Sequence, residues 1–406
     1  MTTIPSEVVY NPFEPDFAVN PYPTYAAMRE NAPVHQTPFG AWFLFRYDDV
    51  QRFLRDPHMS VDERKGRPGP MDQFIQEAIG DTDTRGVTAM LNIDAPDHTR
   101  LRRLVSKVFT PRAIERLRAR VQEIVDGELD AAGQRGEFDL IKDLAFPLPF
   151  TVISELLGMP DIDHDQLRSW SGMLVRTLEP QFDVEVIMAI AAAGEAMGDY
   201  AREVIAAKRS HPADDLLSAL IAAEDEGDVL SDDELVDNVL LLYIAGHETT
   251  VNLIGNGTLA LLNHREQLDR WRNDPELDKA AVDELLRYDP PVQMSRRVTL
   301  QDVEVGGVSI EAGSFVALSL ASANRDPAHW GDAADTLDLG RANAAEHVSF
   351  GGGSHYCLGA SLAKLEAQVA LGTMVRRFPR LELAGDPQWN GRINLRGMDH
   401  LPLAVS

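Results

Sequence analysis

Apolar residues recur with a helical period over most of the chain after residue 97. Apolar residues at positions i, i+3, i+4 and i+7 indicate a helix that buries one face. The pattern predicts helices over residues 98–109, 111–131, 148–157, 164–178, 184–209 and 232–263. Two more helices are expected within residues 275–290, closed by Pro290 and Pro291, and within residues 361–378.

Other segments alternate apolar and polar residues, which is typical of strands. Residues 296–326 alternate in this way, with turns predicted at Gly306-Gly307 and Ala312-Gly313. AWFLF is a short extended run from residue 41, and LPLAVS is a plausible last strand. Residues 60–90 are rich in glycine, proline and charge, and we expect a long loop there.

These patterns predict a mainly α fold with a smaller β lobe. The β-rich parts are expected near residues 35–60 and 296–320 and at the C-terminus, and the helical part at about 98–290 and 358–378. The 406 residues exceed a typical single core. However, the chain has no fixed-period repeat and no Gly/Ser linker, so residues 1–406 are expected to form one unit.

Composition narrows the classes of function. The chain has 38 basic and 64 acidic side chains and a net charge of −26, which disfavours nucleic acid and anionic membranes as partners. Its N-terminus has neither a basic start nor an apolar stretch, so we expect no signal peptide or anchor. A single cysteine excludes an intrachain disulfide and fits a reducing, cytoplasmic location.

The only cysteine, Cys357, follows a run of three glycines and precedes a predicted helix. A thiol binds metal as thiolate, and the amides at a helix start favour that charge. Glycines let the backbone approach a flat group closely. A lone cysteine is more often a small buried residue, and zinc is disfavoured because no second cysteine is present. The motif Phe350-Gly351-x-Gly353-x-His355-x-Cys357-x-Gly359 favours a more specific chemistry.

This spacing resembles the signature of the cytochrome P-450 family, specifically its soluble bacterial members. The resemblance implies the family fold, with heme b (iron protoporphyrin IX) between a long central helix and the helix after the cysteine loop. It implies that Cys357 is the thiolate ligand of the iron and that Phe350 packs near the sulfur. His355 is then hydrogen-bonded to a heme propionate, Gly351 shapes the loop, and Gly359 leaves room for the porphyrin.

The apolar segment 232–263 carries a second motif, Ala245-Gly246-His247-Glu248-Thr249. Ala245, Gly246 and Thr249 share one helical face, where small side chains leave space for a diatomic ligand. A threonine can hydrogen-bond to the carbonyl four residues back and distort the helix. A charged Glu248 in so apolar a helix needs a reason. The segment resembles the family's acid–alcohol pair, which implies that Glu248 and Thr249 deliver protons during oxygen activation, while His247 is expected to pack.

Further residues correspond to the family's structural and cofactor-binding positions. Glu284-x-x-Arg287 resembles its buried ion pair, with Arg341 as a third member, although i,i+3 pairs usually lie on solvated faces. His98 and Arg102, one helical turn apart, and Arg297 before a strand resemble its propionate-binding residues. Arginine pairs with carboxylates in a geometrically specific way, which suits holding a cofactor.

The implied reaction is insertion of one oxygen atom from O2 into an organic substrate. No Gly-x-Gly-x-x-Gly fingerprint is present, so NAD(P)H would act only through an external ferredoxin or flavodoxin and its reductase. Arg102, Arg103, Lys107 and Arg112 are a candidate docking patch, or a solvated helix face. We expect a monomer.

By the same resemblance, the substrate cavity is lined from residues 62–92 and 170–186 and from named side chains elsewhere. These side chains are mostly apolar, which implies a hydrophobic substrate and leaves terpenoids, steroids, fatty acids and macrolides open. The candidates are Met173, Leu174, Leu178, Leu241, Gln293, Met294, Asn394 and Leu395.

Two alternative functions remain open from the sequence. One is a heme-binding sensor or carrier without turnover, and the other is a peroxide-driven peroxygenase. The Glu248/Thr249 pair favours the monooxygenase, because neither alternative depends on proton delivery to dioxygen.

Overall fold

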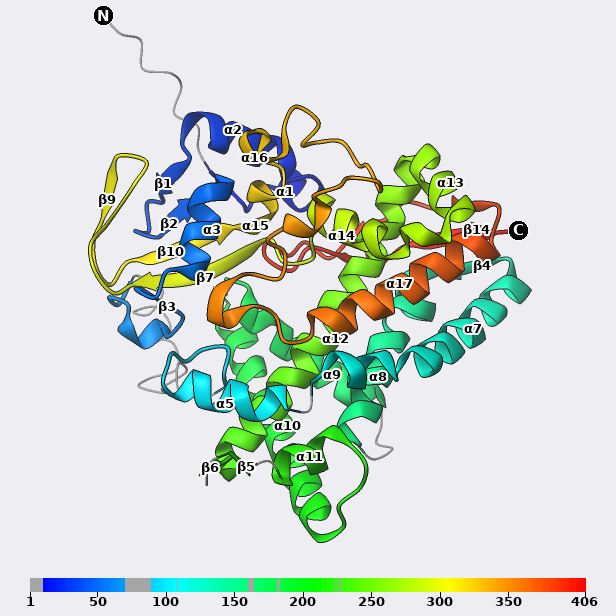
Figure 1. Cartoon of the computed structure of the whole chain (residues 1–406), viewed down its shortest axis with the longest axis horizontal. Coiled ribbons are helices and arrows are strands. Elements are labelled where there is room, and N and C mark those ends of the chain that lie inside the picture. Colours follow the sequence, from blue (N-terminus) through cyan, green and yellow to red (C-terminus); the bar gives the residue numbers. More distant parts are fainter. Residues whose placement is uncertain are drawn as a thin grey trace, which may run out of the picture.

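The apolar helix predicted over residues 232–263 forms with those bounds as α12 (Asp232–Asn263), which runs through the middle of the molecule (Figure 1). Its N-terminus has a capping box. Ser231 Oγ accepts a hydrogen bond from the Glu234 amide at 3.3 Å, and the Glu234 carboxylate accepts one from the Ser231 amide at 2.9 Å. The acidic first turn also matches the positive end of the helix dipole.

The computed structural model describes residues 10–69, 89–107, 109–159, 164–180, 183–222, 224–225 and 228–406. Within these residues the chain is mostly helical with a small β region, as the sequence predicts. The longer helices beside α12 are α2 (Tyr22–Asn31), α3 (Tyr47–Arg55), α5 (Asp97–Ser106), α7 (Arg118–Arg135), α8 (Pro147–Leu157), α9 (His164–Leu174), α10 (Val184–Ser210), α13 (Arg265–Asn273), α14 (Asp278–Tyr288) and α17 (Ala360–Arg377).

Several short helices lie between these elements. The α-helical ones are α1 (Pro15–Val19), α6 (Pro111–Glu115), α11 (Leu216–Ala222), α15 (Leu320–Ala323) and α16 (Pro327–Trp330). The 3-10 turns are η1 (Glu63–Lys65), η3 (Val175–Leu178), η4 (Pro275–Leu277), η5 (Ala344–Glu346) and η6 (Gly353–His355), and a π-helical turn forms η2 (Ile141–Ala145).

Two predicted helices are divided in the structure. The helix expected over 111–131 is α6 followed by α7, and the helix expected over 164–178 is α9 followed by the tighter turn η3. Ile114, Val121 and Val125 are all buried at helical spacing across the first break. Because the apolar period continues through residues 116–117, periodicity alone could not reveal that break.

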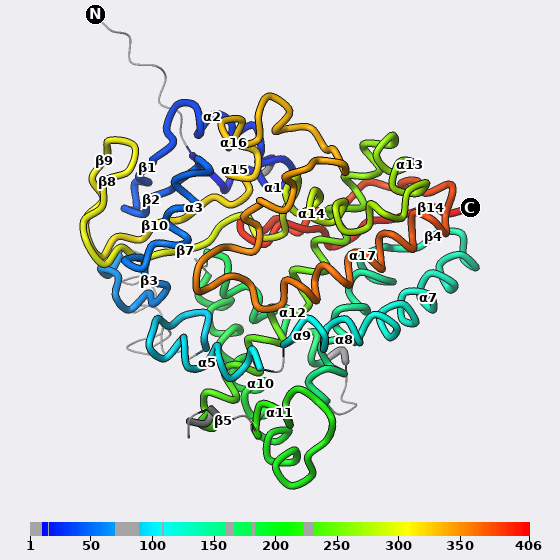
Figure 2. The backbone as a smooth tube through the Cα atoms, viewed as in Figure 1, coloured from blue at the N-terminus to red at the C-terminus, as the bar shows by residue number. Residues whose placement is uncertain are grey.

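The main sheet joins two distant parts of the chain, as predicted. Its order is β1-β2-β10-β7-β3, with β10 parallel to β2 and the other neighbours antiparallel. Figure 2 shows the early strands beside β7 and β10. The strands are β1 (Val34–Gln36), β2 (Trp42–Leu44), β3 (Met59–Ser60), β7 (Met294–Thr299) and β10 (Phe315–Ser319).

Smaller sheets complete the β region. The last strand, β14, lies between β11 and β4 in a three-stranded sheet. The predicted Gly306-Gly307 turn, with φ of 59° and 78°, links β8 to β9. The strands are β4 (Glu137–Asp139), β5 (Glu224–Asp225), β6 (Asp228–Val229), β8 (Val303–Val305), β9 (Val308–Ile310), β11 (Leu381–Leu383), β12 (Gln388–Trp389), β13 (Met398–His400) and β14 (Pro402–Val405).

Two hydrophobic clusters share α12. Its first half packs with α9 and α10, and its second half packs with α14 and α17, on which α7 packs in turn. A third cluster lies between the main sheet and α3. Among the described residues, no helix has the length and hydrophobicity of a membrane span.

Candidate functional site

The loop before α17 presents the single thiol. Gly351 and Gly353 have φ of 70° and 66°, a left-handed conformation that glycine adopts without strain. A side chain at Gly353 would also clash, since its Cβ would lie 2.7 Å from the Leu54 carbonyl oxygen. The Cys357 amide donates to the Phe350 carbonyl at 3.0 Å and closes the loop. The glycines therefore set the position of the cysteine.

The sulfur lies at the positive end of α17. Protein atoms around Cys357 reduce its hydration and raise its pKa, although the residue still borders open space; hydrogen bonds from the Gly359 and Ala360 amides and the charge of Arg102 lower the pKa. These donors would stabilise a Cys357 thiolate that is bound to a metal cation.

The surroundings of Cys357 include open space. Cys357 itself is exposed, and a Cβ at Gly359 would meet no atom within 4 Å. Ala245 is exposed halfway along α12, although Leu242, Tyr243 and His247 around it are buried. An exposed alanine in the middle of a core helix indicates a space beside it. The predicted places for a planar cofactor are thus open at Ala245 and Gly359.

Four basic side chains gather near the cysteine loop. The rings of His98 on α5 and His355 lie 3.9 Å apart between centroids. Burial and the positive charges of His98, Arg297 and Arg102 lower the pKa of His355 to about 3, and burial lowers the pKa of Arg297 to about 10. Asp94 is the one acid that acts against these shifts.

Among the described residues, these four basic groups have no anionic partner at ion-pair distance. His98 is buried, and its Nε2 has no hydrogen-bond partner among the described residues. Arg297 donates to Ser295 Oγ at 3.0 Å and to the Arg296 carbonyl at 2.7 Å, and Arg102 donates to the Tyr356 carbonyl at 2.5 Å. Within the described ranges, neither arginine has a carboxylate at ion-pair distance. The cluster therefore fits the two propionates of heme b.

The centre of α12 carries the predicted acid and alcohol. Thr249 Oγ1 donates to the Ala245 carbonyl at 3.0 Å, the back-bonded geometry expected from the sequence. Glu248 forms an ion pair with Arg392 of the C-terminal segment, and both side chains are largely covered, with 14% and 22% exposed. Arg392 was not among the predicted site residues. The apolar surroundings of Glu248 indicated that its charge needs a reason, but no pattern in the sequence singled out one of the 38 basic residues as its partner.

Gly246 lies against a neighbouring helix. A Cβ there would lie 3.2 Å from Ile153 of α8, and the space for a diatomic ligand expected at this position stays a prediction. Successive helix positions differ by about 100°, so the residue after the open Ala245 turns towards α8. Gly246 thus permits close packing of two helices.

His247 packs in the core, as expected. It is fully buried, its Nδ1 lies 2.8 Å from the Tyr243 carbonyl oxygen, and its ring meets Phe146 and Phe150 edge-on. Burial lowers the pKa of His247, so the ring is neutral at pH 7.

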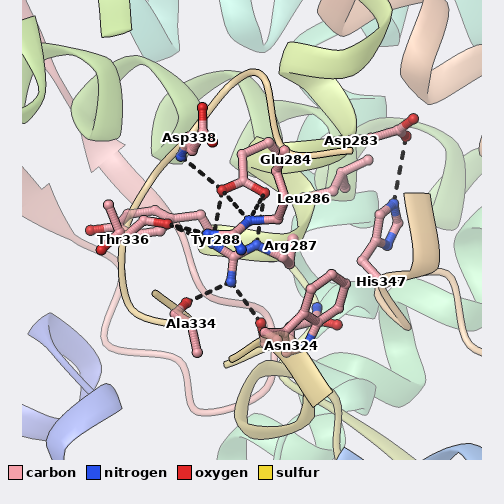
Figure 3. A network of polar contacts seen from close by, with 12 residues as sticks. Asp283, Glu284, Leu286, Arg287, Tyr288, Asn324, Ala334, Thr336, Asp338 and His347 are labelled. Atoms are coloured by element: carbon pink, nitrogen blue, oxygen red, sulfur yellow. Dashed lines mark hydrogen bonds and ion pairs between the residues drawn. The ribbon is translucent and has the colours of Figure 1, made fainter. Parts of the chain in front are cut away.

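The predicted Glu284 and Arg287 meet in a buried network (Figure 3), and Arg341 also pairs with Glu284. Arg287 donates to both carboxylate oxygens of Glu284 at 2.7 and 2.8 Å, and Arg341 Nε lies 3.1 Å from Glu284 Oε2. Arg287 also donates to the carbonyls of Asn324, Ala334 and Thr336. The network ties α14 to the chain that leads to the cysteine loop.

The predicted substrate residues separate into two groups. Leu178, Leu241, Met173 and Met294 keep partly exposed side chains. Met173 lines a cavity of about 310 Å³ between α9 and α10, together with Trp170 and Ala192.

The other predicted substrate residues need correction. Gln293 and Leu395 are each 1% exposed and Leu174 is 8% exposed, so they face no open space. Gln293 Nε2 donates to the Pro290 carbonyl at 2.7 Å. The Asn394 side chain accepts from the Met294 amide at 3.0 Å and donates to the Leu178 carbonyl at 3.2 Å, so it joins segments.

Part of the predicted lining cannot be located. Residues 70–88 of the predicted lining 62–92 and residues 181–182 of the lining 170–186 lie outside the described residues. The candidate docking patch is described: Arg102 is half-buried, whereas Arg103, Lys107 and Arg112 are exposed on α5 and α6 and their junction.

Comparison with known proteins places the chain among close relatives. The family model described as cytochrome P-450 matches residues 46–390. Vitamin D(3) 25-hydroxylase of Pseudonocardia autotrophica is 43% identical over 401 residues, which are 97% of this chain and 96% of that protein. The 6-deoxyerythronolide B hydroxylase of Saccharopolyspora erythraea is 40% identical over 422 residues and matches 100% of both chains.

Solved structures agree with this similarity. The cytochrome P-450 PksS of the Bacillus subtilis 168 bacillaene polyketide synthase has a TM-score of 0.88 and 38% identity, and the match covers 98% of this chain and 100% of that chain.

Proposed function

This chain belongs to the cytochrome P-450 family of heme-binding monooxygenases, and we propose that it inserts one oxygen atom of O2 into a large, mainly apolar small molecule, with Cys357 as the ligand of the heme iron. The second oxygen atom leaves as water after two electrons and two protons have been taken up. The observation that carries the proposal is an exposed, amide-supported thiol beside four basic groups that have no anionic partner within the described part of the chain.

We assign the cofactor contacts from this geometry. Cys357 would ligate the iron, and His98, Arg102, Arg297 and His355 would hold the propionates. Ala245 and Gly359 would face the porphyrin, Phe350 would pack near the sulfur, and Gly351 and Gly246 would shape the loop and the helix packing. When bound, heme supplies the oxygen chemistry, and a thiolate ligand favours cleavage of the O–O bond.

The residues of α12 would supply protons and exclude water. Thr249 Oγ1 donates a hydrogen bond to the Ala245 carbonyl. The lone pairs of this oxygen remain available to accept a hydrogen bond from a group in the open space beside Ala245. Glu248 is one residue away and would replace the proton that Thr249 passes on. A Thr249→Ala variant is expected to consume electrons but to lose most of its product as peroxide.

The substrate class follows from the lining and from the relatives. Leu178, Leu241 and Met294 present apolar surface, which favours a hydrophobic ligand. One relative is named for hydroxylation of 6-deoxyerythronolide B and another for hydroxylation of vitamin D(3). We propose a polyketide-derived or similarly sized alicyclic substrate, hydroxylated or epoxidised at carbon.

Electrons would come from a separate protein. We propose a ferredoxin or flavodoxin with its NAD(P)H-dependent reductase, docking on Arg103, Lys107 and Arg112 near the cysteine loop. Arg102 connects this surface to the loop through the Tyr356 carbonyl.

A carbon monoxide difference spectrum of the reduced holoprotein tests the proposal. The Soret band of the wild type is expected near the position of a thiolate-ligated heme, and Cys357→His is expected to shift it to the histidine-ligated position. An unshifted band in the variant would overturn the assignment of Cys357. A thiolate spectrum without turnover by any redox partner would favour a sensor, and turnover by peroxide alone would favour a peroxygenase.

A further inference from the structure

One carboxylate on the pocket side holds three consecutive backbone amides of the C-terminal segment. Glu179, directly after η3, accepts from the amides of Ile393 at 2.9 Å, Asn394 at 3.0 Å and Leu395 at 2.7 Å. Hydrogen bonds to a charged acceptor are about twice as strong as neutral ones. Glu179 therefore fixes the backbone of residues 392–395, here called the 392–395 segment.

The 392–395 segment is also tied to itself and to residues proposed to contact substrate. Asn390 accepts from the Arg392 amide at 3.0 Å and donates to the Leu395 carbonyl at 3.1 Å. Asn394 bonds to the Leu178 carbonyl and to the Met294 amide, at 3.2 and 3.0 Å. A shift of Leu178 or Met294 would thus be transmitted to this segment.

The side chain of Arg392, the first residue of the segment, contacts Glu248, the proposed proton donor. Arg392 forms its ion pair with Glu248 of α12, and this carboxylate is mostly covered. A largely covered carboxylate depends on its cation for both charge compensation and orientation. A continuous set of contacts therefore leads from Glu179, at the end of η3, to Glu248.

We propose that Arg392 is a positioning residue for Glu248, and that the 392–395 segment couples the occupancy of the substrate pocket to proton delivery. The inference rests on the proposed function, because it assumes that Glu248 supplies protons. An occupied pocket would fix residues 175–179 and hence Arg392, so that Glu248 takes its working orientation when a substrate is present. An empty pocket would leave the orientation of Glu248 less defined.

Arg392→Gln in the heme-loaded enzyme tests the proposal, with Arg392→Lys as the conservative variant. In Arg392→Gln we expect product formed per electron pair to fall about fivefold, the lower end of typical site-to-site coupling. The solvent kinetic isotope effect on turnover should rise. The substrate dissociation constant from the Soret titration should change less than about twofold, because Arg392 acts on proton delivery and not on substrate binding. Arg392→Lys should recover most of the yield.

Glu179→Gln tests the transmission step. It keeps the shape of the side chain but removes the charge that holds the amides, so it should lower the yield in the same direction. Its effect should not add to that of Arg392→Gln in the double variant, because both act through one path. If the two effects add, the segment does not couple the sites.

The controls separate the possible failures. Arg376→Gln removes a partly buried ion pair with Asp278 elsewhere and should leave yield and isotope effect unchanged. If Glu248→Gln alters both quantities but Arg392→Gln does not, the inference is overturned and the proposed function stands. If Glu248→Gln alters neither, the proton role in the proposed function is wrong. Should Arg392→Gln fail to fold, Glu179→Gln supplies the same measurements, and an unchanged yield and isotope effect in that variant would overturn the inference.

Discussion

At the scale of single residues, the site is defined by charge without a counter-charge. The chain has 64 acidic side chains, yet Asp94 is the one acid among the described residues that acts on His355 and Arg297 near Cys357. Such a grouping disfavours the charged form of its members in the free protein, because burial and the neighbouring arginines lower the pKa of His355 and burial lowers that of Arg297. Its natural compensation is a bound group that carries two carboxylates, so these cations and the open sulfur select the same cofactor.

Glu366 on α17 is a second residue whose charge state matters. It is 1% exposed, and burial raises its pKa from about 4.5 to about 8, with Thr250 offsetting part of the shift. Because the folded-state pKa lies above the unfolded value, folding takes up a proton between these two values. The stability from this group is complete below about pH 4.5 and is lost as the pH rises through about 8.

We therefore predict that the melting temperature of the wild type falls between pH 6 and pH 9 more than that of Glu366→Gln. At pH 9 the variant should be more stable by about 1–3 kcal/mol, since its neutral amide avoids a buried charge. Thermal unfolding monitored by circular dichroism at several pH values measures this. Parallel pH profiles for the two proteins would contradict it.

At the scale of elements, α12 shows how neighbouring positions take different tasks. Ala245 opens to space, Gly246 packs on α8, His247 fills the core, Glu248 pairs with Arg392, and Thr249 bonds back to Ala245. Each step of about 100° turns the next side chain to another neighbour. Each of the five residues of the motif therefore suits a different environment around one helix.

The network of α14 gives a prediction at the same scale. Arg287 and Glu284 are 0% exposed, so Arg287→Ala removes one of the two arginines that pair with the buried Glu284 carboxylate and should cost about 3–5 kcal/mol. Arg287→Lys should also be strongly destabilised, because lysine cannot replace the bonds to the carbonyls of Asn324, Ala334 and Thr336.

The midpoint of urea unfolding of the holoprotein measures this cost. The Arg202–Asp199 pair has the same spacing of three residues but is 58% and 68% exposed. Arg202→Ala should therefore change stability by no more than about 0.5 kcal/mol. Equal losses for Arg202→Ala and Arg287→Ala would show that burial does not decide the value of such pairs here.

At the scale of the whole molecule, the net charge of −26 is unfavourable for an acidic electron donor. A local basic surface at Lys107 and Arg112 would offset this repulsion at one place and direct docking there. We predict that Lys107→Glu/Arg112→Glu lowers the rate constant of reduction by an acidic [2Fe–2S] ferredoxin about tenfold at low salt.

The difference should shrink as salt is added, because screening shortens the range of the charges. Stopped-flow reduction at several ionic strengths measures it, and Lys142→Glu on η2 is the matched control. An unchanged rate in the double variant would remove this surface as the docking site.

The sequence by itself determined the elements and the signature positions. Helical period predicted α12 with its observed bounds and α14 to within three residues, and the Gly306-Gly307 turn and the glycines before Cys357 were readable because backbone conformation depends on local side-chain sterics. The need of Glu248 for a partner was also readable, since a carboxylate in an apolar helix is costly without one.

Only the tertiary structure decided which distant residues meet. It paired Glu248 with Arg392 across 144 positions and bonded Glu179 to the amides of residues 393–395. It also turned Gly246 towards α8 and closed Gln293 and Leu395 away from open space. Such contacts depend on how elements pack and on the direction of each side chain, and local sequence patterns carry no information about a partner more than a few turns away.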